Sequence, residues 1–175
     1  MNHAEHLVDL IDENGRTVGN KQRQEINKSV DLYHTVFVVL CTPDHKLILS
    51  KIPERTDLPN VYAGRLGATV ATIRRHNETP DEAGIRAVNT ELFIKTTQLK
   101  HLGDTYLILP DGHRNYMSVY KCTHTMPEDF SNKDIETLQA FSQGEFDNAI
   151  GTDKGKFSLT FLAIWQKYQE NLLSD

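Results

Sequence analysis

The sequence predicts an α+β fold with a mixed β-sheet in a single domain. Segments with strand patterns outnumber segments with helix patterns, and the helix patterns occur singly or late in the chain. The 175 residues suit one domain, and no repeat, low-complexity tract or Pro/Gly/Ser-rich linker divides them. We therefore expect residues 1–175 to share one core.

Most of the expected strands are short runs rich in β-branched and aromatic residues, bounded by turn signals. Asn14-Gly15 after an apolar run predicts a hairpin, because both residues tolerate positive φ. Residues 33–41 are typical of a buried central strand. The other expected strands are 6–11, 46–50, 62–72 with interruptions at Gly64 and Gly67, 97–109, 114–123 and 137–141.

Capping signals predict where the helices begin. Thr79, Pro80 and Glu82 combine an N-cap, a proline at the first helical position and the acidic residue of a capping box, which predicts a helix from 79 to about 93. A second capping box at residues 142–145 predicts a short helix. A third helix is expected from near Ser158, with an aromatic and aliphatic packing stripe.

Composition excludes several classes of protein. A net charge of −5 offers no basic stripe for nucleic acid, so we expect no nucleic-acid partner. The longest apolar run, residues 36–41, is too short to cross a bilayer, and we expect no membrane association. Residues 1–6 lack a secretory pattern, and Cys41 and Cys122 are expected to be reduced and buried. Together these features predict a cytoplasmic protein.

The segment from 66 to 94 resembles the Nudix box. That pattern has Gly, five residues, Glu, seven residues, and then Arg-Glu-apolar-any-Glu-Glu-any-Gly-apolar. Glu78 and Arg86 keep the seven-residue gap. The other matching residues are Leu66-Gly67-Ala68-Thr69-Val70, Thr79-Pro80-Asp81-Glu82-Ala83, Val88, Glu91-Leu92 and Ile94. The residues at 7–9, 12–15 and 157–160 are similar to the Nudix subgroup nearest isopentenyl-diphosphate isomerase.

The resemblance covers about residues 6–170 and implies a Nudix-type mixed β-sheet sandwiched between helices. It also implies a metal-dependent pyrophosphohydrolase that uses Mg²⁺ or Mn²⁺. The hydrolases of this family place three carboxylates at i, i+3 and i+4 of the box helix, where they share one face. Here these positions hold Ala87, Thr90 and Glu91.

Further departures affect the box glycines and the loop before the helix. Phe93 stands where the pattern has glycine, Asn77 stands where the family has a further glycine directly before the Glu, and extra residues separate Gly67 from Glu78. The resemblance therefore implies an activity that is weak, altered or lost.

The candidate site residues follow from this resemblance. Glu91 is the candidate catalytic residue and metal ligand, or else an ordinary helix carboxylate, with further ligands sought among Glu128, Asp129 and Glu136. Glu78, Arg86 and Gly67 are expected to be structural, Arg86 pairing with Glu78 or Glu82. The candidate substrate-binding residues are His34, Lys51, Arg55 and Arg114.

Three functions remain open at this point. The first is hydrolysis of a nucleoside diphosphate derivative with Mg²⁺ or Mn²⁺, and the second is binding of such a small diphosphate ligand without catalysis and without a cofactor. The third, isopentenyl-diphosphate isomerisation, is disfavoured because Gly67 and Thr69 stand where a cysteine and a histidine are expected. A homodimer is the default oligomer for such a domain.

Overall fold

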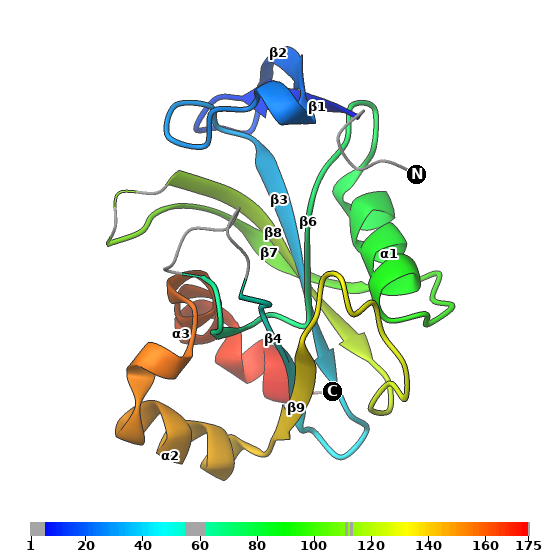
Figure 1. Ribbon diagram of the computed structural model, residues 1–175, viewed down its shortest axis with the longest axis vertical. Helices are drawn as coiled ribbons and strands as arrows, with labels where there is room; N and C mark the ends of the chain where they lie inside the picture. Colours follow the sequence, from blue (N-terminus) through cyan, green and yellow to red (C-terminus); the bar gives the residue numbers. More distant parts are fainter. Residues whose placement is uncertain (1–5, 55–61, 111, 113, 175) are drawn as a thin grey trace.

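The computed structural model describes residues 6–54, 62–110, 112 and 114–174 (Figure 1). In these residues the chain forms a two-stranded and a seven-stranded sheet with three α-helices. The strands are β1 (Leu7–Ile11), β2 (Thr17–Gln22), β3 (His34–Cys41), β4 (Leu47–Lys51), β5 (Leu66–Gly67), β6 (Val70–Ile73), β7 (Lys100–Ile108), β8 (Arg114–Thr123) and β9 (Thr137–Phe141). The helices are η2 (Arg23–Glu25), α1 (Pro80–Glu91), α2 (Gln143–Thr152), η3 (Lys154–Lys156) and α3 (Leu159–Leu173).

Strand β3 is the centre of the large sheet. It pairs antiparallel with β6 and then with β4 along one edge, and parallel with β8 along the other. The strand order is β5-β4-β3-β8-β7, with β9 beside β4. The sheet is mixed, as predicted. Where β3 changes partner, Thr69 bridges the gap, because its hydroxyl accepts from Leu40 N at 2.7 Å and donates to the Ile48 carbonyl.

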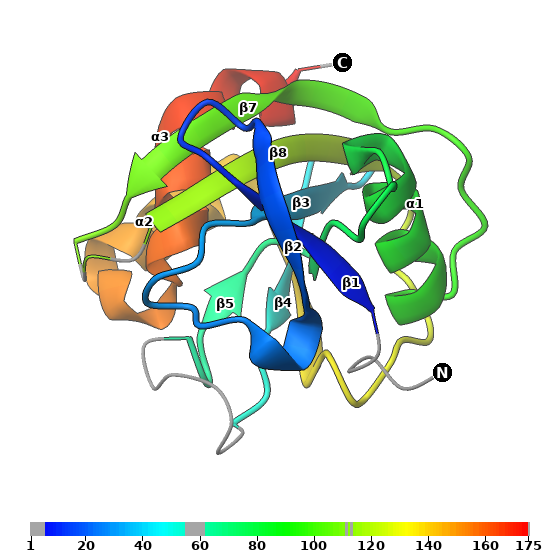
Figure 2. The same cartoon turned by 90° about the horizontal axis from the view of Figure 1, so that it is seen from above.

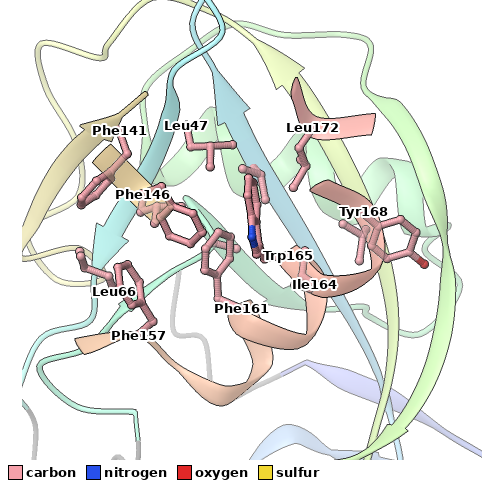
Figure 3. Packing of buried hydrophobic residues seen from close by; sticks show 14 of the residues in the cluster. Leu47, Leu66, Phe141, Phe146, Phe157, Phe161, Ile164, Trp165, Tyr168 and Leu172 are labelled. Carbon is pink, nitrogen blue, oxygen red and sulfur yellow. The ribbon is translucent and has the colours of Figure 1, made fainter. Parts of the chain in front are cut away.

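Helices cover both faces of this sheet (Figure 2). Because side chains alternate along a strand, Val36 and Val38 of β3 pack with α1, whereas Val39 packs with α2 and α3. Aromatic residues fill the α3 side, where Phe146 meets Trp165 with ring centroids 4.6 Å apart (Figure 3). The expected packing stripe of the C-terminal helix is thus confirmed.

The capping residues set the start of the helices as predicted. Thr79 is the N-cap of α1, and its Oγ1 accepts from Glu82 N while Glu82 reaches back to Thr79 N. The predicted end was two residues too late, because α1 ends at Glu91 and Phe93 has a φ of 54°. A left-handed residue cannot continue a right-handed helix.

The expectation for residues 62–72 needs correction, and the loop before α1 has a specific anchor. Residues 62–72 form two short strands, β5 and β6, separated by Ala68 and Thr69 rather than one interrupted strand. The basic loop before α1 is anchored, because buried Asp9 accepts from Arg74 Nη2 at 3.2 Å and from His76 Nδ1 at 2.7 Å. This contact ties the β1–β2 hairpin to the start of α1.

The hairpin and the cysteines match their predictions. β1 and β2 pair around Gly15, whose φ is 78°. Cys41 and Cys122 are free and buried. Within the described ranges, no helix has both the length and the hydropathy needed to span a bilayer.

Candidate functional site

A cavity of about 420 Å³ lies between β3, the C-terminal half of α1 and the first turn of α3. One wall is formed by Tyr33, directly before β3, and by Thr35 and Phe37 of β3. These residues alternate with Val36 and Val38, so they point away from the face that α1 covers. The volume is in the range of sites for small molecules.

Cationic side chains from separate segments line this cavity. Arg23 and Lys28 come from the connection between β2 and β3, Lys133 from the segment before β9, and Arg86 from α1. The charges of Arg86 and Arg23 act on Glu91, where they oppose the rise in the pKa of that carboxyl group caused by burial. Arg23, Arg86 and Glu91 therefore share one region of the cavity.

Two carboxylates, Glu91 and Asp134, face this cavity from different elements. Burial and, to a smaller extent, the charge of Asp134 raise the pKa of Glu91 to about 8, although the charges of Arg86 and Arg23 oppose this rise. The loop carrying Asp134 is fixed to the end of α1, since Ser131 N donates to the Glu91 carbonyl at 2.7 Å. Ser131 Oγ in turn donates to Asp134 Oδ2, also at 2.7 Å.

Arg86 is held by Glu78 in a bidentate pair. Its Nε donates to Glu78 Oε1 at 2.7 Å and its Nη2 to Oε2 at 2.8 Å. Burial alone would raise the pKa of Glu78, but hydrogen bonds from Arg86 and from Arg75 N outweigh it and hold the pKa below its ordinary value. Of the two expected partners of Arg86, the structure selects Glu78. The remaining guanidinium donors bind Thr72 Oγ1 and the Ile73 carbonyl, both at 3.2 Å.

His34 lies on the face of the sheet opposite the cavity. Its Nε2 hydrogen-bonds Ser118 Oγ at 2.7 Å, and Ser118 Oγ donates to Asp104. Burial and the charge of Arg74 lower the pKa of His34 to about 4, so the ring is neutral. The structure thus places His34 in a buried hydrogen-bond network and apart from the other candidates.

The other candidate substrate-binding residues are dispersed. Lys51 pairs with Glu136, its Nζ 2.6 Å from Oε1, and Arg114 Nη2 donates to the Val30 carbonyl at 2.6 Å. Neither lines the cavity, whereas Gly67 does, in β5. Arg55 lies outside the described residues.

Comparison with known proteins identifies the fold. No family model and no curated protein matches the sequence. The structure is similar to that of DR0079 from Deinococcus radiodurans, with a TM-score of 0.73 and 18% identity over 93% of this chain and 99% of that one. A Nudix hydrolase from Nitrosomonas europaea superposes with a TM-score of 0.60 and 16% identity over 81% and 91% of the two chains. The chain has the Nudix fold.

A third similar structure contains a ligand. It is the Nudix domain of Shewanella oneidensis NrtR complexed with ADP ribose, with a TM-score of 0.60 and 11% identity over 87% of this chain and 94% of that one. The Nudix fold of the present chain therefore occurs, in another protein, together with a diphosphate-containing nucleotide derivative.

The structure places the three positions where the resemblance implies carboxylates, Ala87, Thr90 and Glu91, on α1. Ala87 is buried against the sheet, and Thr90 Oγ1 donates to the Arg86 carbonyl at 2.8 Å. Of these three residues, Glu91 alone has a carboxylate. The two positions where the resemblance expects glycine, Asn77 and Phe93, have φ values of 61° and 54°. Their backbone keeps the left-handed conformation that favours glycine.

Several cavity residues were missed by the sequence reasoning. Asp134, Arg23 and Lys28 were not singled out, and Glu136, one of the carboxylates considered as a partner of Glu91, is occupied by Lys51 instead. The sequence does not show that Asp134 lies near Glu91, because the two residues are brought together by the contact of Ser131 with the end of α1. No pattern near residue 134 announces that contact.

A divalent cation fits this site only with help from a ligand. Among the residues that the structure describes, no three His, Cys, Asp or Glu side chains gather closely enough to hold a metal ion. Mg²⁺ is often held by one or two carboxylates together with substrate phosphates. Glu91 and Asp134 are the residues that would supply those carboxylates.

Proposed function

We propose that this protein binds a nucleoside diphosphate derivative in the cavity. The observation that supports this best is the composition of the lining. It combines the cationic residues Arg23, Lys28 and Lys133 with the aromatic residues Tyr33, Phe37 and Tyr62. Lysine and arginine bind phosphate oxygens by charge-assisted hydrogen bonds. Aromatic rings provide flat surfaces on which a base stacks.

The cations that come from the β2–β3 connection have a direct role in this proposal. Arg23 is exposed, lines the cavity and acts electrostatically on Glu91 and Tyr33. An exposed guanidinium at a cavity mouth can bind a diphosphate without first losing a buried partner. The contacts of Lys51 and Arg114 with Glu136 and Val30 make those two residues weaker candidates for the same task.

Metal-dependent hydrolysis of the bound diphosphate is our second candidate, and the Glu91–Asp134 pair favours it. A divalent cation between these carboxylates and the ligand phosphates would neutralise charge and orient an attacking water. The buried Ala87 explains why the activity would be weaker than that of a site with three box carboxylates. Isomerisation of isopentenyl diphosphate ranks last, because Gly67 and Thr69 stand where a cysteine and a histidine are expected.

A thermal-shift panel tests the proposed binding. Nucleoside diphosphates, dinucleoside polyphosphates, nucleotide sugars and pyrophosphate are added to the protein with and without Mg²⁺. A ligand at 100 times its Kd stabilises the folded state by about 2.7 kcal/mol, which is readily detected. We expect at least one nucleoside diphosphate derivative to raise Tm. A panel in which no ligand raises Tm contradicts the proposal.

Phosphate release on the same plate separates binding from hydrolysis. We expect release to require Mg²⁺ or Mn²⁺ and to be lost in Glu91→Gln, with Glu128→Gln as the control for an exposed glutamate outside the cavity. Ligands that raise Tm without any release leave the protein as a non-catalytic binder. Release that survives in Glu91→Gln eliminates hydrolysis at this carboxylate.

A further inference from the structure

Strand β8 contributes one residue to the cavity wall beside β3. This residue is Asn115, which lines the cavity. Asn115 and Tyr33 directly precede the first pair of residues in the parallel register of β8 and β3, so they are neighbours on the sheet. Along β8, Asn115 alternates in step with Met117 and Val119, which pack in the core cluster that α3 covers. The side chain of Asn115 therefore points to the face of the sheet that holds the cavity.

This face of the sheet changes from apolar to polar where the cavity begins. Val39 of β3 and Met117 and Val119 of β8 share the face and are fully buried against the C-terminal helices. Nearer the start of each strand, the same face carries Thr35 and Asn115, and both residues are only partly buried. The two strands thus present apolar side chains to the helices and polar side chains to the cavity.

The side-chain amide of Asn115 is available to a ligand. It makes no hydrogen bond with any residue in the part of the chain that the structure describes. Other polar side chains of the lining are committed, since Ser50 Oγ donates to the Ala68 carbonyl at 2.8 Å and Thr69 bridges β3 and β4. A carboxamide has two N–H donors and one carbonyl acceptor, so Asn115 offers both kinds of group to a molecule in the cavity.

The neighbours of Asn115 suit the other parts of a nucleotide. Tyr33 provides an aromatic ring next to the amide, and aromatic rings stack on bases. The charge of Arg23 opposes the rise that burial causes in the pKa of the Tyr33 phenol, which places this cation near the same ring. The lining therefore combines an amide, a ring and a phosphate-binding cation in adjoining positions.

We propose that Asn115 reads the base of the bound nucleotide through a pair of hydrogen bonds to the edge of the ring. The inference rests on the proposed function and adds to it a specificity-determining residue. Bases present an N–H donor beside an acceptor, and a carboxamide pairs with both, as asparagine does with N6 and N7 of adenine. The ligand class is then a nucleotide with a base, rather than a simple diphosphate.

Equilibrium titrations with matched ligands test this inference on the wild-type protein. We measure Kd for ADP, for purine riboside 5′-diphosphate, which lacks the amino group of adenine, and for pyrophosphate, which has no base. We expect ADP to bind about tenfold more tightly than the purine riboside compound, as the loss of one hydrogen bond would cause. Asn115→Leu, which is similar in volume and has no polar atoms, should abolish this difference. The same variant should change the Kd for pyrophosphate by less than about twofold.

A second variant reverses the hydrogen-bonding character of the site. Asn115→Asp keeps the shape of the side chain, but a carboxylate only accepts hydrogen bonds. Guanine presents two adjacent N–H groups to a carboxylate, whereas adenine presents one N–H beside an acceptor nitrogen. We expect the ratio of the Kd for ADP to the Kd for GDP to rise about tenfold over wild type. The added negative charge weakens both ligands alike, so the ratio cancels its effect. Asn148→Asp, at an exposed position of α2 outside the cavity, is the control and should leave the ratio unchanged.

The outcomes separate the two proposals. If pyrophosphate and ADP bind but wild type does not distinguish ADP from the purine riboside compound, the inference about Asn115 is wrong while the proposed function stands. An unchanged preference in Asn115→Leu, or an unchanged ratio in Asn115→Asp, has the same meaning. If one variant fails to fold in a thermal melt, the wild-type preference and the other variant decide. If neither pyrophosphate nor any nucleotide binds, both proposals fail.

Discussion

Ser131 joins Glu91 to Asp134, because its N–H donates to the Glu91 carbonyl and its Oγ to Asp134 Oδ2, each at 2.7 Å. This contact brings a carboxylate from the segment before β9 close to Glu91, the candidate catalytic residue. Burial and the neighbouring Asp134 raise the pKa of Glu91 to about 8. The site therefore carries an unfavourable charge whenever Glu91 is ionised.

This relationship predicts a pH-dependent stability. A carboxyl group whose pKa rises from 4.5 in the unfolded chain to about 8 in the fold holds its proton more tightly when folded. The contribution of protonated Glu91 to the free energy of unfolding is full below pH 4.5 and is lost as the pH rises to about 8. We expect Glu91→Gln to stabilise the protein by about 1 kcal/mol or more at pH 8.5 and by much less at pH 5. Urea unfolding at the two pH values checks this. Equal effects at both would contradict it.

The Arg86–Glu78 pair should be a major contributor to stability. Removing one partner of a largely buried, bidentate pair leaves the other charge without compensation, so Arg86→Ala is expected to lower the free energy of unfolding by about 2 kcal/mol or more. The exposed Lys46–Asp44 pair, 3.3 Å apart, is the matched control, and Lys46→Ala should change stability by less than about 0.5 kcal/mol. Similar losses in both variants, measured by urea unfolding, would show that the buried pair has no special role.

His34 is predicted to be a structural residue. His34→Ala removes a buried hydrogen bond and ring, and we expect a loss of about 2 kcal/mol in unfolding free energy. Since the ring is on the face opposite the cavity, Kd for a nucleoside diphosphate should change less than about twofold in this variant. A folded His34→Ala protein that no longer binds would place His34 in the site after all.

The pKa of His34 also predicts a direction of acid sensitivity. It falls from 6.5 in the unfolded chain to about 4 in the fold, so the unfolded chain takes up this proton first. The neutral ring stabilises the fold above pH 6.5, and that contribution is lost as the pH falls toward 4. Proton NMR of the ring should show a midpoint near 4. A midpoint near 6.5 would contradict the buried network.

The left-handed residue after α1 predicts a stabilising substitution. Phe93 has a φ of 54° and is 56% exposed, so it combines backbone strain with little packing. Phe93→Gly should raise the unfolding free energy on the order of 0.5–1 kcal/mol, because relief of strain exceeds the added entropy of the unfolded chain. Asn77→Gly should gain less, since asparagine tolerates this conformation. Destabilisation by Phe93→Gly in a thermal melt would argue against the strain.

The sequence predicted those features that local chemistry determines. The Thr79 and Ser142 capping boxes, the hairpin at Gly15 and the alternating core strand β3 each depend on neighbours in the chain, and each is confirmed. The end of α1 was harder, because Phe93 adopts a conformation that its side chain disfavours.

The candidate site was predicted only in part, for a physical reason. Glu91 and Gly67 do line the cavity, yet Arg23, Asp134 and Asn115 reach it through contacts between distant segments. His34 was a candidate that the structure places outside the cavity. Side chains alternate between the two faces of β3, and because both faces are apolar and buried, the sequence did not show which face His34 occupies.

The most direct test of the account is an isothermal titration of ADP into wild-type protein and into Arg23→Ala. Arg16→Ala, which removes an exposed arginine of the hairpin away from the cavity, is the control. The account predicts binding by wild type and the control, with Kd about tenfold weaker in Arg23→Ala, as the loss of one phosphate-binding cation would cause. The same Kd in all three proteins, or no binding by wild type, would contradict a diphosphate site in this cavity.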